Sequence, residues 1–354
     1  MRRHSYAAVA LIATAVVSCG PRAVISGSPA LRTIVADAGE RHFGTIRQLT
    51  YGGENAEAYF SPDGRSLIFQ STRDGRTCDQ QYVMRTDGSG LQRVSSGAGK
   101  TTCGYFIDGG QRIIYASTHA ADTTCPPRPD PSRGYVWRLD PFDIFRANAD
   151  GSDRDRLTNY GVYTAEATLS PDGRTIVFTS MKDGDLDIYT MNVDGTNIRR
   201  LTNTPGYDGG PFFSHDGKMI VYRAHHPTGS DLESYRDLLR QGLIRPNRME
   251  LFVMNADGSN QRQVTNLGGA NFAPIFTPDD RRIIFSSNHK NPRSRNFDLF
   301  LVNLDGSALE QVTTHPEFDG FPMFSPDGKQ LVWASNRNAP VAGGTDVFLA
   351  DWKP

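Results

Sequence analysis

The chain has 354 residues, with 38 Lys and Arg against 39 Asp and Glu, so its formal net charge is −1 at pH 7. This balance gives no reason to expect nucleic acid as the main partner, because proteins that bind nucleic acids usually carry a basic excess on one face. Hydrophobic residues at 38% and charged residues at 22% are typical of a soluble globular chain rather than a disordered or multi-pass membrane protein. The 35 Gly and 21 Pro residues indicate many turns between short strands.

The N-terminus has the features of an export signal. Arg2 and Arg3 precede an apolar stretch over residues 7–17, which is too short to span a bilayer but fits a secretory signal. Ser18 and Cys19 then resemble the bacterial lipobox, in which the Cys is lipidated and becomes the mature N-terminus. The alternative is an ordinary signal peptide followed by a chance cysteine.

These features predict a lipoprotein signal peptide over residues 1–18, a lipid anchor on Cys19, a tether over residues 19–44 and a folded domain over residues 45–354. Gly20 stands where an Asp would resemble an inner-membrane retention signal. We therefore expect an exported, membrane-anchored lipoprotein on the periplasmic side of the outer membrane.

A turn sequence recurs along the chain, and its first copy is Ser61-Pro62-Asp63-Gly64. Pro fits position i+1 of a type I turn, Asp suits the next position, and Gly accepts the left-handed conformation that follows. The six copies, one of them degenerate, occupy residues 61–64, 107–110, 170–173, 214–217, 277–280 and 325–328. An apolar run follows each copy, and such runs read as strands buried on both faces.

Further strand-like segments complete each repeat. A second apolar segment follows each of these strands, and in five of six repeats it leads into an Asp-Gly turn, which is a strong hairpin signal. A third segment completes a four-stranded repeat everywhere except in the last repeat, and the missing copy lies at residues 46–50. Four strands in about 45 residues are typical of a β-propeller. We predict an all-β, six-bladed propeller that closes when residues 46–50 pair with residues 346–351.

These motifs resemble the PD40 (WD40-like) repeats of TolB-type propellers over residues 46–352. The resemblance implies a TolB-like binding scaffold, although only some 26 residues separate Cys19 from Ile46, too few for the N-terminal α/β domain of TolB. The propeller of prolyl oligopeptidases is similar too, but the chain has no Gly-x-Ser-x-Gly motif of their hydrolase domain.

Two insertions between the second and third strands, in blades 2 and 4, fall on one face of the predicted propeller. They cover residues 120–140 and 227–248, and residues 231–239 read as a helix capped by Ser230 or Asp231. Long insertions on a rigid scaffold usually carry function. We therefore expect ligands on this face, with Tyr235 of the helix among the contacts, unless the loops merely tolerate extra length.

Alignment of the repeats adds two columns of residues to that face. A polar column precedes each turn, at Asn55, Thr101, Thr164, Asp208, Asn271 and Asp319. A basic or histidine column ends each second strand, at Arg73, His119, Lys182, His226, His289 and Arg337. The two columns either fix loops through ion pairs or form a funnel that accepts an anionic peptide, sugar or carboxylate.

Metal and cysteine sites are weaker hypotheses. Glu57 and Glu166 occupy equivalent positions in blades 1 and 3 and could hold Ca²⁺ in the channel, whereas no other cofactor is expected. The histidines lack the close spacing of transition-metal ligands. In an exported protein, two of the three cysteines Cys78, Cys103 and Cys125 are expected to form a disulfide, but their spacing does not decide which.

Two classes of function remain open. The first is a monomeric envelope lipoprotein that binds a protein, peptide or glycan on the insertion face, without catalysis. The second is a metal-assisted lyase or hydrolase that acts in the funnel. The first is favoured because no nucleophile–base motif is present.

Overall fold

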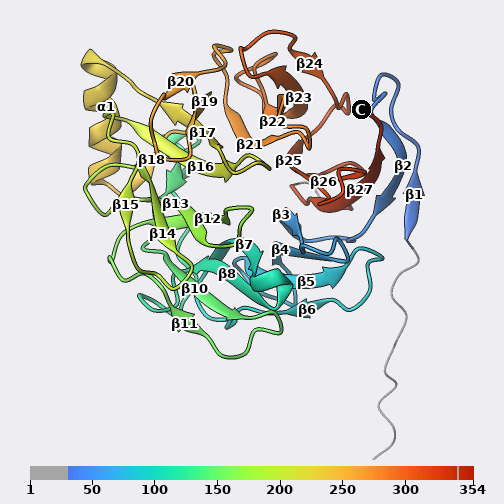
Figure 1. The fold of residues 1–354 in the computed structure, drawn as a ribbon, viewed down its shortest axis with the longest axis horizontal. Helices are drawn as coiled ribbons and strands as arrows, with labels where there is room; N and C mark the ends of the chain where they lie inside the picture. The colour runs from blue at the N-terminus through green and yellow to red at the C-terminus, as the bar shows by residue number, and fades with distance from the viewer. Residues whose placement is uncertain (1–30, 341–342) are drawn as a thin grey trace, which may run out of the picture. The chain divides into compact units, whose positions relative to one another are not determined.

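Six antiparallel sheets surround a central channel, and each inner strand lies close to the next one around the ring (Figure 1). A computed structural model describes residues 31–340 and 343–354. The predicted signal peptide and Cys19 lie outside the described residues. The six-bladed, all-β architecture predicted from the repeats is confirmed.

The blades follow one another in chain order, with the first strand of each innermost. Blade 1 contains β3 (Glu54–Phe60), β4 (Ser66–Thr72), β5 (Gln80–Arg85) and β6 (Gln92–Arg93). Blade 2 contains β7 (Thr101–Ile107), β8 (Arg112–Ser117), β10 (Asp143–Asn148) and β11 (Asp155–Arg156). Blade 3 contains β12 (Thr164–Leu169), β13 (Thr175–Ser180), β14 (Asp187–Asn192) and β15 (Arg199–Arg200).

The second half of the ring repeats this pattern. Blade 4 contains β16 (Tyr207–Phe213), β17 (Met219–His225), β19 (Glu250–Asn255) and β20 (Arg262–Gln263). Blade 5 contains β21 (Asn271–Phe276), β22 (Arg282–Ser287), β23 (Asp298–Asn303) and β24 (Glu310–Gln311). Blade 6 contains β25 (Asp319–Phe324), β26 (Gln330–Ser335) and β27 (Asp346–Trp352), and it takes its outer strand from the start of the chain.

The recurring turn sequence acts through its side chains. Asp63 Oδ1 accepts hydrogen bonds from Ser61 Oγ at 2.6 Å and from the Arg65 backbone N–H at 3.0 Å, and Gly64 adopts a φ of 70°. The same Ser/Thr–Asp hydrogen bond returns in blades 3, 4, 5 and 6. The degenerate copy in blade 2 forms the short 3-10 turn η1 (Asp108–Gly110) instead.

The ring closes as the sequence predicts. In β2 (Phe43–Gln48), Ile46, Arg47 and Gln48 pair with Ala350, Leu349 and Phe348 of β27. A further short strand that the sequence did not reveal, β1 (Arg32–Ile34), pairs with the outer edge of β2. Residues 32–34, which the sequence assigned to a tether over 19–44, are therefore part of the sheet of blade 6.

A buried ion cluster joins this N-terminal segment to blade 6. The guanidinium of Arg337 lies 3.0 Å from Glu40 Oε1 and 2.9 Å from Asp319 Oδ2, and the Arg337 side chain is only 3% exposed. Nearby, His42 stacks on Trp352 with ring centroids 4.8 Å apart. The N-terminal segment is thus fixed by charge and by packing, in addition to the strand pairing.

No helix in the described part of the chain is long and apolar enough to cross a membrane.

Replacing Glu40 with Gln should lower the free energy of unfolding by roughly 2 kcal/mol, because buried Arg337 would keep only one of its two carboxylate partners. Arg41→Gln, one residue away, is the matched control. Arg41 is 74% exposed and its ion pair with Glu310 is worth less than about 0.5 kcal/mol. Urea denaturation of both variants tests this, and equal stabilities would contradict a stabilising role for the cluster.

Candidate binding site at the channel mouth

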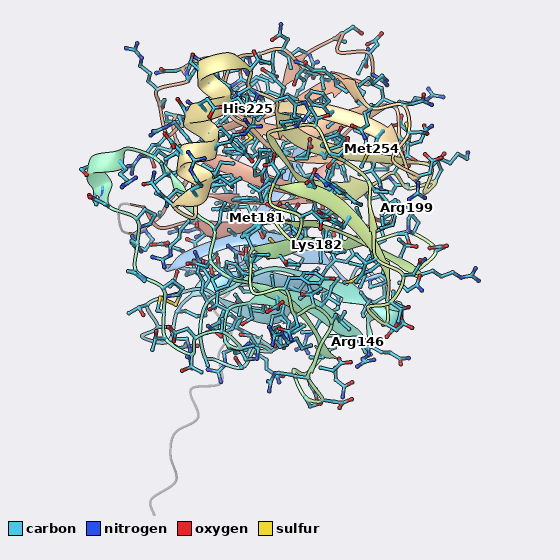
Figure 2. The ribbon with its side chains drawn as sticks, turned by 90° about the vertical axis from the view of Figure 1, so that its left-hand side faces the viewer. Arg146, Met181, Lys182, Arg199, His225 and Met254 are labelled. Atoms are coloured by element: carbon cyan, nitrogen blue, oxygen red, sulfur yellow. A yellow bond between two sulfur atoms is a disulfide. The ribbon has the colours of Figure 1, made fainter. Side chains whose placement is uncertain are left out.

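The two insertions meet each other on one face of the propeller. In blade 2, β9 (Trp137–Arg138) pairs with β18 (Leu243–Ile244) of the blade 4 insertion, so the two insertions form a small sheet. Figure 2 shows helix α1 (Gly229–Arg240) and His225 towards one side of the blades, with Arg199 on the other side. The predicted helix is therefore present.

Tyr235, expected to contact a ligand, instead fixes α1 to the propeller. Its side chain is 7% exposed, and its hydroxyl lies 2.5 Å from Asp185 Oδ1 and 2.8 Å from the Gly206 carbonyl oxygen. The helix begins after Thr228, not after Ser230 or Asp231 as expected. Tyr235 is therefore an anchor for the insertion and is not available on its surface.

Members of the basic column have partners within their own blades. Arg73 donates to Asn55 Oδ1 at 2.7 Å, and His226 Nε2 lies 2.9 Å from Asp208 Oδ1. Arg337 binds Asp319, as described above. All six residues of the polar column are fully buried and do not ring an open channel mouth. The column pairs thus act as the loop-fixing contacts that the sequence offered as one alternative.

The other three members of the basic column also bind side chains of their own blades. His119 and His289 contact the hydroxyls of Ser117 and Ser287, at 2.7 and 3.0 Å, and Lys182 pairs with Asp183. Burial is the main cause that lowers the pKa of His119 and of His289, which favours their neutral forms. The funnel of free cations that was the other alternative is not what the structure presents.

A different column lines the channel, two positions after the polar one. Each inner strand has a β-bulge there, and the bulged residue adopts a left-handed conformation with φ between 47° and 61°. The six residues are Glu57, Cys103, Glu166, Gly210, Ala273 and Phe321. All six border one small cavity of about 30 Å³. The sequence paired Glu57 with Glu166 correctly as equivalents, but it gave no sign of the bulge.

Glu166 is the most strongly bound of these side chains. It forms an ion pair with Arg223, and its Oε2 accepts hydrogen bonds from Thr179 Oγ1 and from the Gly210 N–H, both at 2.8 Å. The Arg223 guanidinium also lies over the ring of Trp137, 5.6 Å from its centroid. The one sign of Arg223 in the sequence is that it is the only Arg at its position among the six second strands.

Glu57 is the titratable group of the channel. Its Oε2 accepts a hydrogen bond from the Cys103 N–H at 3.1 Å, and burial raises its pKa to about 7, with a smaller contribution from Glu166. Burial likewise raises the pKa of the free thiol of Cys103, which is therefore protonated and unreactive.

The calcium hypothesis does not fit this arrangement. Arg223 neutralises Glu166, so only Glu57 remains as a carboxylate donor in the channel lining. Within residues 31–340 and 343–354, no three His, Cys, Asp or Glu side chains lie close enough together to hold a metal ion.

Above the channel lies a chamber of about 400 Å³. Its floor contains Glu57, Cys103, Glu166 and Arg223. Aromatic side chains from Tyr163, Tyr207, Phe272, Phe297, Phe318 and Phe321 line much of its walls, and charged residues such as Asp79 and Lys100 also border it. Residues 126–129 and 135–140 of the blade 2 insertion line its outer part. We define this space as the roofed chamber.

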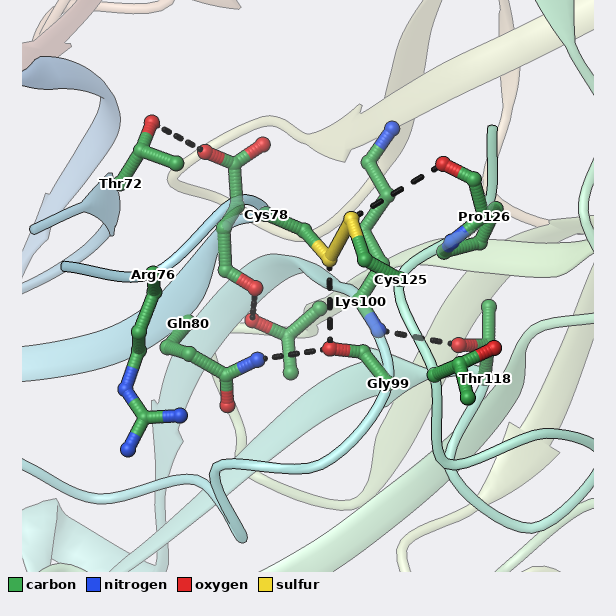
Figure 3. The surroundings of a disulfide bond; sticks show 12 residues. Thr72, Arg76, Cys78, Gln80, Gly99, Lys100, Thr118, Cys125 and Pro126 are labelled. Carbon is green, nitrogen blue, oxygen red and sulfur yellow. Dashed lines mark hydrogen bonds between the residues drawn. A yellow bond between two sulfur atoms is a disulfide. The ribbon is translucent and has the colours of Figure 1, made fainter. Parts of the chain in front are cut away.

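A disulfide links the blade 2 insertion, which forms the roof of the chamber, to blade 1. It joins Cys78 to Cys125, whose Cα atoms are 5.8 Å apart (Figure 3). Among the described cysteines, Cys103 is the one outside this bond. This settles the pairing that the sequence left open. Nearby, Gln80 Nε2 at the start of β5 donates to the Gly99 carbonyl oxygen at 2.8 Å. The blade 2 insertion is thus fixed at Cys125 and again at β9.

Comparisons with known proteins agree with the fold. The family described as PD40, TolB beta propeller domain, matches residues 139–233 and 243–350, which together make up more than half of the chain. None of the curated proteins matches the sequence.

Several solved structures are similar at low sequence identity. A putative TolB from Agrobacterium tumefaciens is 19% identical with a TM-score of 0.55, covering 85% of this chain and 91% of that one. A gluconolactonase from Xanthomonas campestris is 14% identical with a TM-score of 0.59, covering 92% and 98%. An oligogalacturonate lyase in complex with manganese is 16% identical with a TM-score of 0.53, covering 91% and 96%. These likenesses concern the fold alone.

Gly210→Ala should destabilise the protein and displace the Arg223 guanidinium. A Cβ at this position would lie 2.0 Å from Arg223 Nη1, in addition to the strain of a φ of +61°. Gly161→Ala is the matched control, since its φ is +69° but no atom lies within 4 Å of the added Cβ. We expect a loss of about 1 kcal/mol for the control and at least twice that for Gly210→Ala in urea denaturation. Equal losses would contradict the close approach of Arg223.

Glu57 should make the folded protein less stable as the pH rises. Its pKa is about 7 in the folded state against 4.5 unfolded, so the folded state holds a proton that the unfolded state releases. The stabilisation is complete below about pH 4.5 and is lost as the pH rises through 7. Glu57→Gln should therefore flatten the fall in melting temperature between pH 5 and 8. Glu54→Gln, exposed on the same strand, should leave the profile unchanged. Identical profiles for all three proteins would show that Glu57 titrates normally.

Proposed function

Because the chain belongs to the TolB β-propeller (PD40) family, we propose that it is an exported binding protein whose roofed chamber receives part of a peptide or glycan ligand. The observation that carries this proposal is the chamber itself. A cavity that combines aromatic side chains with polar and charged groups is typical of ligand-binding sites.

The polar groups of the chamber support binding in a defined orientation. Arg223 is held by Glu166 and by Tyr207, whose hydroxyl lies 2.6 Å from its Nη2, so it does not reorganise when a ligand arrives. Glu57 has fewer partners and changes protonation near neutral pH. It is the group most available to hydrogen-bond a ligand.

Export and anchoring are part of the proposal. The disulfide between Cys78 and Cys125 supports an oxidising compartment, where such bonds persist. Together with the signal sequence, this favours a lipoprotein anchored through Cys19 on the periplasmic side of the outer membrane.

A lyase or hydrolase acting in the same chamber is the second candidate. One observation favours it: a carboxyl group with a pKa near 7 is suited to general acid or base catalysis. Relatives in fold include both a TolB and a manganese-bound lyase, so the architecture is compatible with either function.

Site-specific photo-crosslinking tests the binding function. A photoreactive amino acid is placed at Tyr135, which borders the chamber, or at Lys218, which is 80% exposed beside the turn of blade 4. In the Cys19→Ser background, expressed with its export signal, envelope extracts should give adducts from Tyr135 and none from Lys218. Mass spectrometry of the adducts then distinguishes a peptide from a glycan. Equal yields at both positions, or adducts at Lys218 alone, would contradict the proposal. Turnover of a captured glycan that is lost in Glu57→Gln would indicate the second candidate.

A further inference from the structure

A second cavity of about 730 Å³ lies beside the roofed chamber, between the end of the blade 4 insertion and two loops of blade 5. Its lining includes four arginines, Arg245, Arg248, Arg293 and Arg295, and no Asp or Glu. We call this cavity the arginine groove. In a chain whose charges nearly balance, such a local excess of one sign needs an explanation.

These arginines differ from the basic column because they are exposed and largely unpaired. Within the described residues, Arg293 and Arg295 form no ion pair, and Arg245 contacts only the Arg133 carbonyl oxygen, at 3.1 Å. Arg248 pairs with exposed Asp231 at 3.1 Å, a contact that solvent weakens. At least three guanidinium groups are therefore free to bind carboxylates, whose geometry they match.

The groove adjoins the chamber. Three aromatic residues, Tyr135, Phe297 and Phe318, border both cavities. Tyr135 is 58% exposed, yet its hydroxyl accepts a hydrogen bond from Trp137 Nε1 at 2.9 Å, which fixes its ring. One elongated ligand can therefore lie along the arginines and pass the aromatic boundary into the chamber.

The groove offers little to the main chain of a peptide. The Gly268 N–H donates to Glu250 Oε1 and the Ala270 N–H to Asn288 Oδ1, at 2.7 and 2.8 Å. Peptides that bind in extended form use free backbone groups of the receptor. Small residues and the exposed ring of Tyr135 instead provide flat apolar surfaces, which suit the faces of sugar rings.

We infer that the arginine groove binds a carboxylated oligosaccharide, whose uronate groups pair with the arginines while one end reaches the roofed chamber. This inference names the ligand class for the proposed binding function. It rests on the proposed function only in placing one end of the oligosaccharide in the roofed chamber.

Calorimetry with hexagalacturonate tests the inference on the purified full chain. The fully methyl-esterified hexamer has the same sugar chain without the charges, and hexaglutamate has the charges without the sugars. We expect binding of hexagalacturonate that weakens with added salt, and at least tenfold weaker binding of the ester and of hexaglutamate. Undetectable binding of hexagalacturonate, equal binding of the ester, or tighter binding of hexaglutamate would overturn the inference.

Paired substitutions locate the binding site. Arg293→Ala with Arg295→Ala should weaken hexagalacturonate about tenfold and reduce the salt dependence. The control, Arg174→Ala with Arg281→Ala, removes two exposed arginines that follow the first turns of blades 3 and 5, and should change nothing. Unchanged affinity after the first pair, or equal losses for both pairs, would overturn the inference.

Trp137→Ala separates this inference from the proposed function. If Trp137→Ala weakens binding and the groove pair does not, the chamber binds the ligand and the arginine groove does not. If only the Arg293 and Arg295 pair weakens binding, the arginine groove is confirmed as the binding site. The claim that one end of the ligand reaches the roofed chamber would then be wrong. Melting temperatures of all variants confirm that they remain folded.

Discussion

A left-handed residue in every inner strand is the constraint on which the channel depends. For residues other than Gly, this conformation costs about 1–2 kcal/mol each, yet it occurs at the same position in all six blades. In blades 2, 4 and 6, the N–H of the bulged residue donates to a side chain of the preceding blade, to Glu57, Glu166 and Ser286 respectively. The strained positions thus join neighbouring blades and define the lining of the channel.

The residues of that lining determine which side chains can pack at the channel mouth. Gly210 leaves open the space that the Arg223 guanidinium fills, and Arg223 in turn neutralises Glu166. Trp137 reaches from the blade 2 insertion to cover Arg223 and contacts Phe272 of blade 5, with ring centroids 5.0 Å apart. The roof therefore depends on the channel below it, as well as on the disulfide and the strand pair that fix its ends.

Much of the fold could be predicted from the sequence, because each blade repeats the same local chemistry. Turn residues such as Ser61 and Asp63 bond to each other within a few positions, so their pattern is visible in one dimension. The closing strand β2 could be predicted because the last repeat lacks its fourth segment, and a matching segment lies at the start of the chain. Strand β1 was not, because three partly exposed residues carry no periodicity, and Glu40 is recognisable as structural only once Arg337 is seen beside it.

The site was harder to predict, because the availability of a side chain depends on its neighbours in space. The repeats place six basic residues on the same face, but three of them bind the polar-column residue of their own blade, and the other three bind a Ser or Asp beside them in the chain. Arg293 and Arg295 could not be predicted as binding residues from the repeats, since they lie in a loop outside every repeated motif.

The cationic side chains discussed above therefore form two groups. Where a cation belongs to a repeated position, the same repeat supplies its carboxylate, amide or hydroxyl partner, and the pair stabilises the blade. Arg293 and Arg295 lie in a loop that no repeat constrains, and within the described residues neither of them forms an ion pair. The residues most able to meet an anionic ligand are accordingly those that the repeat pattern does not explain.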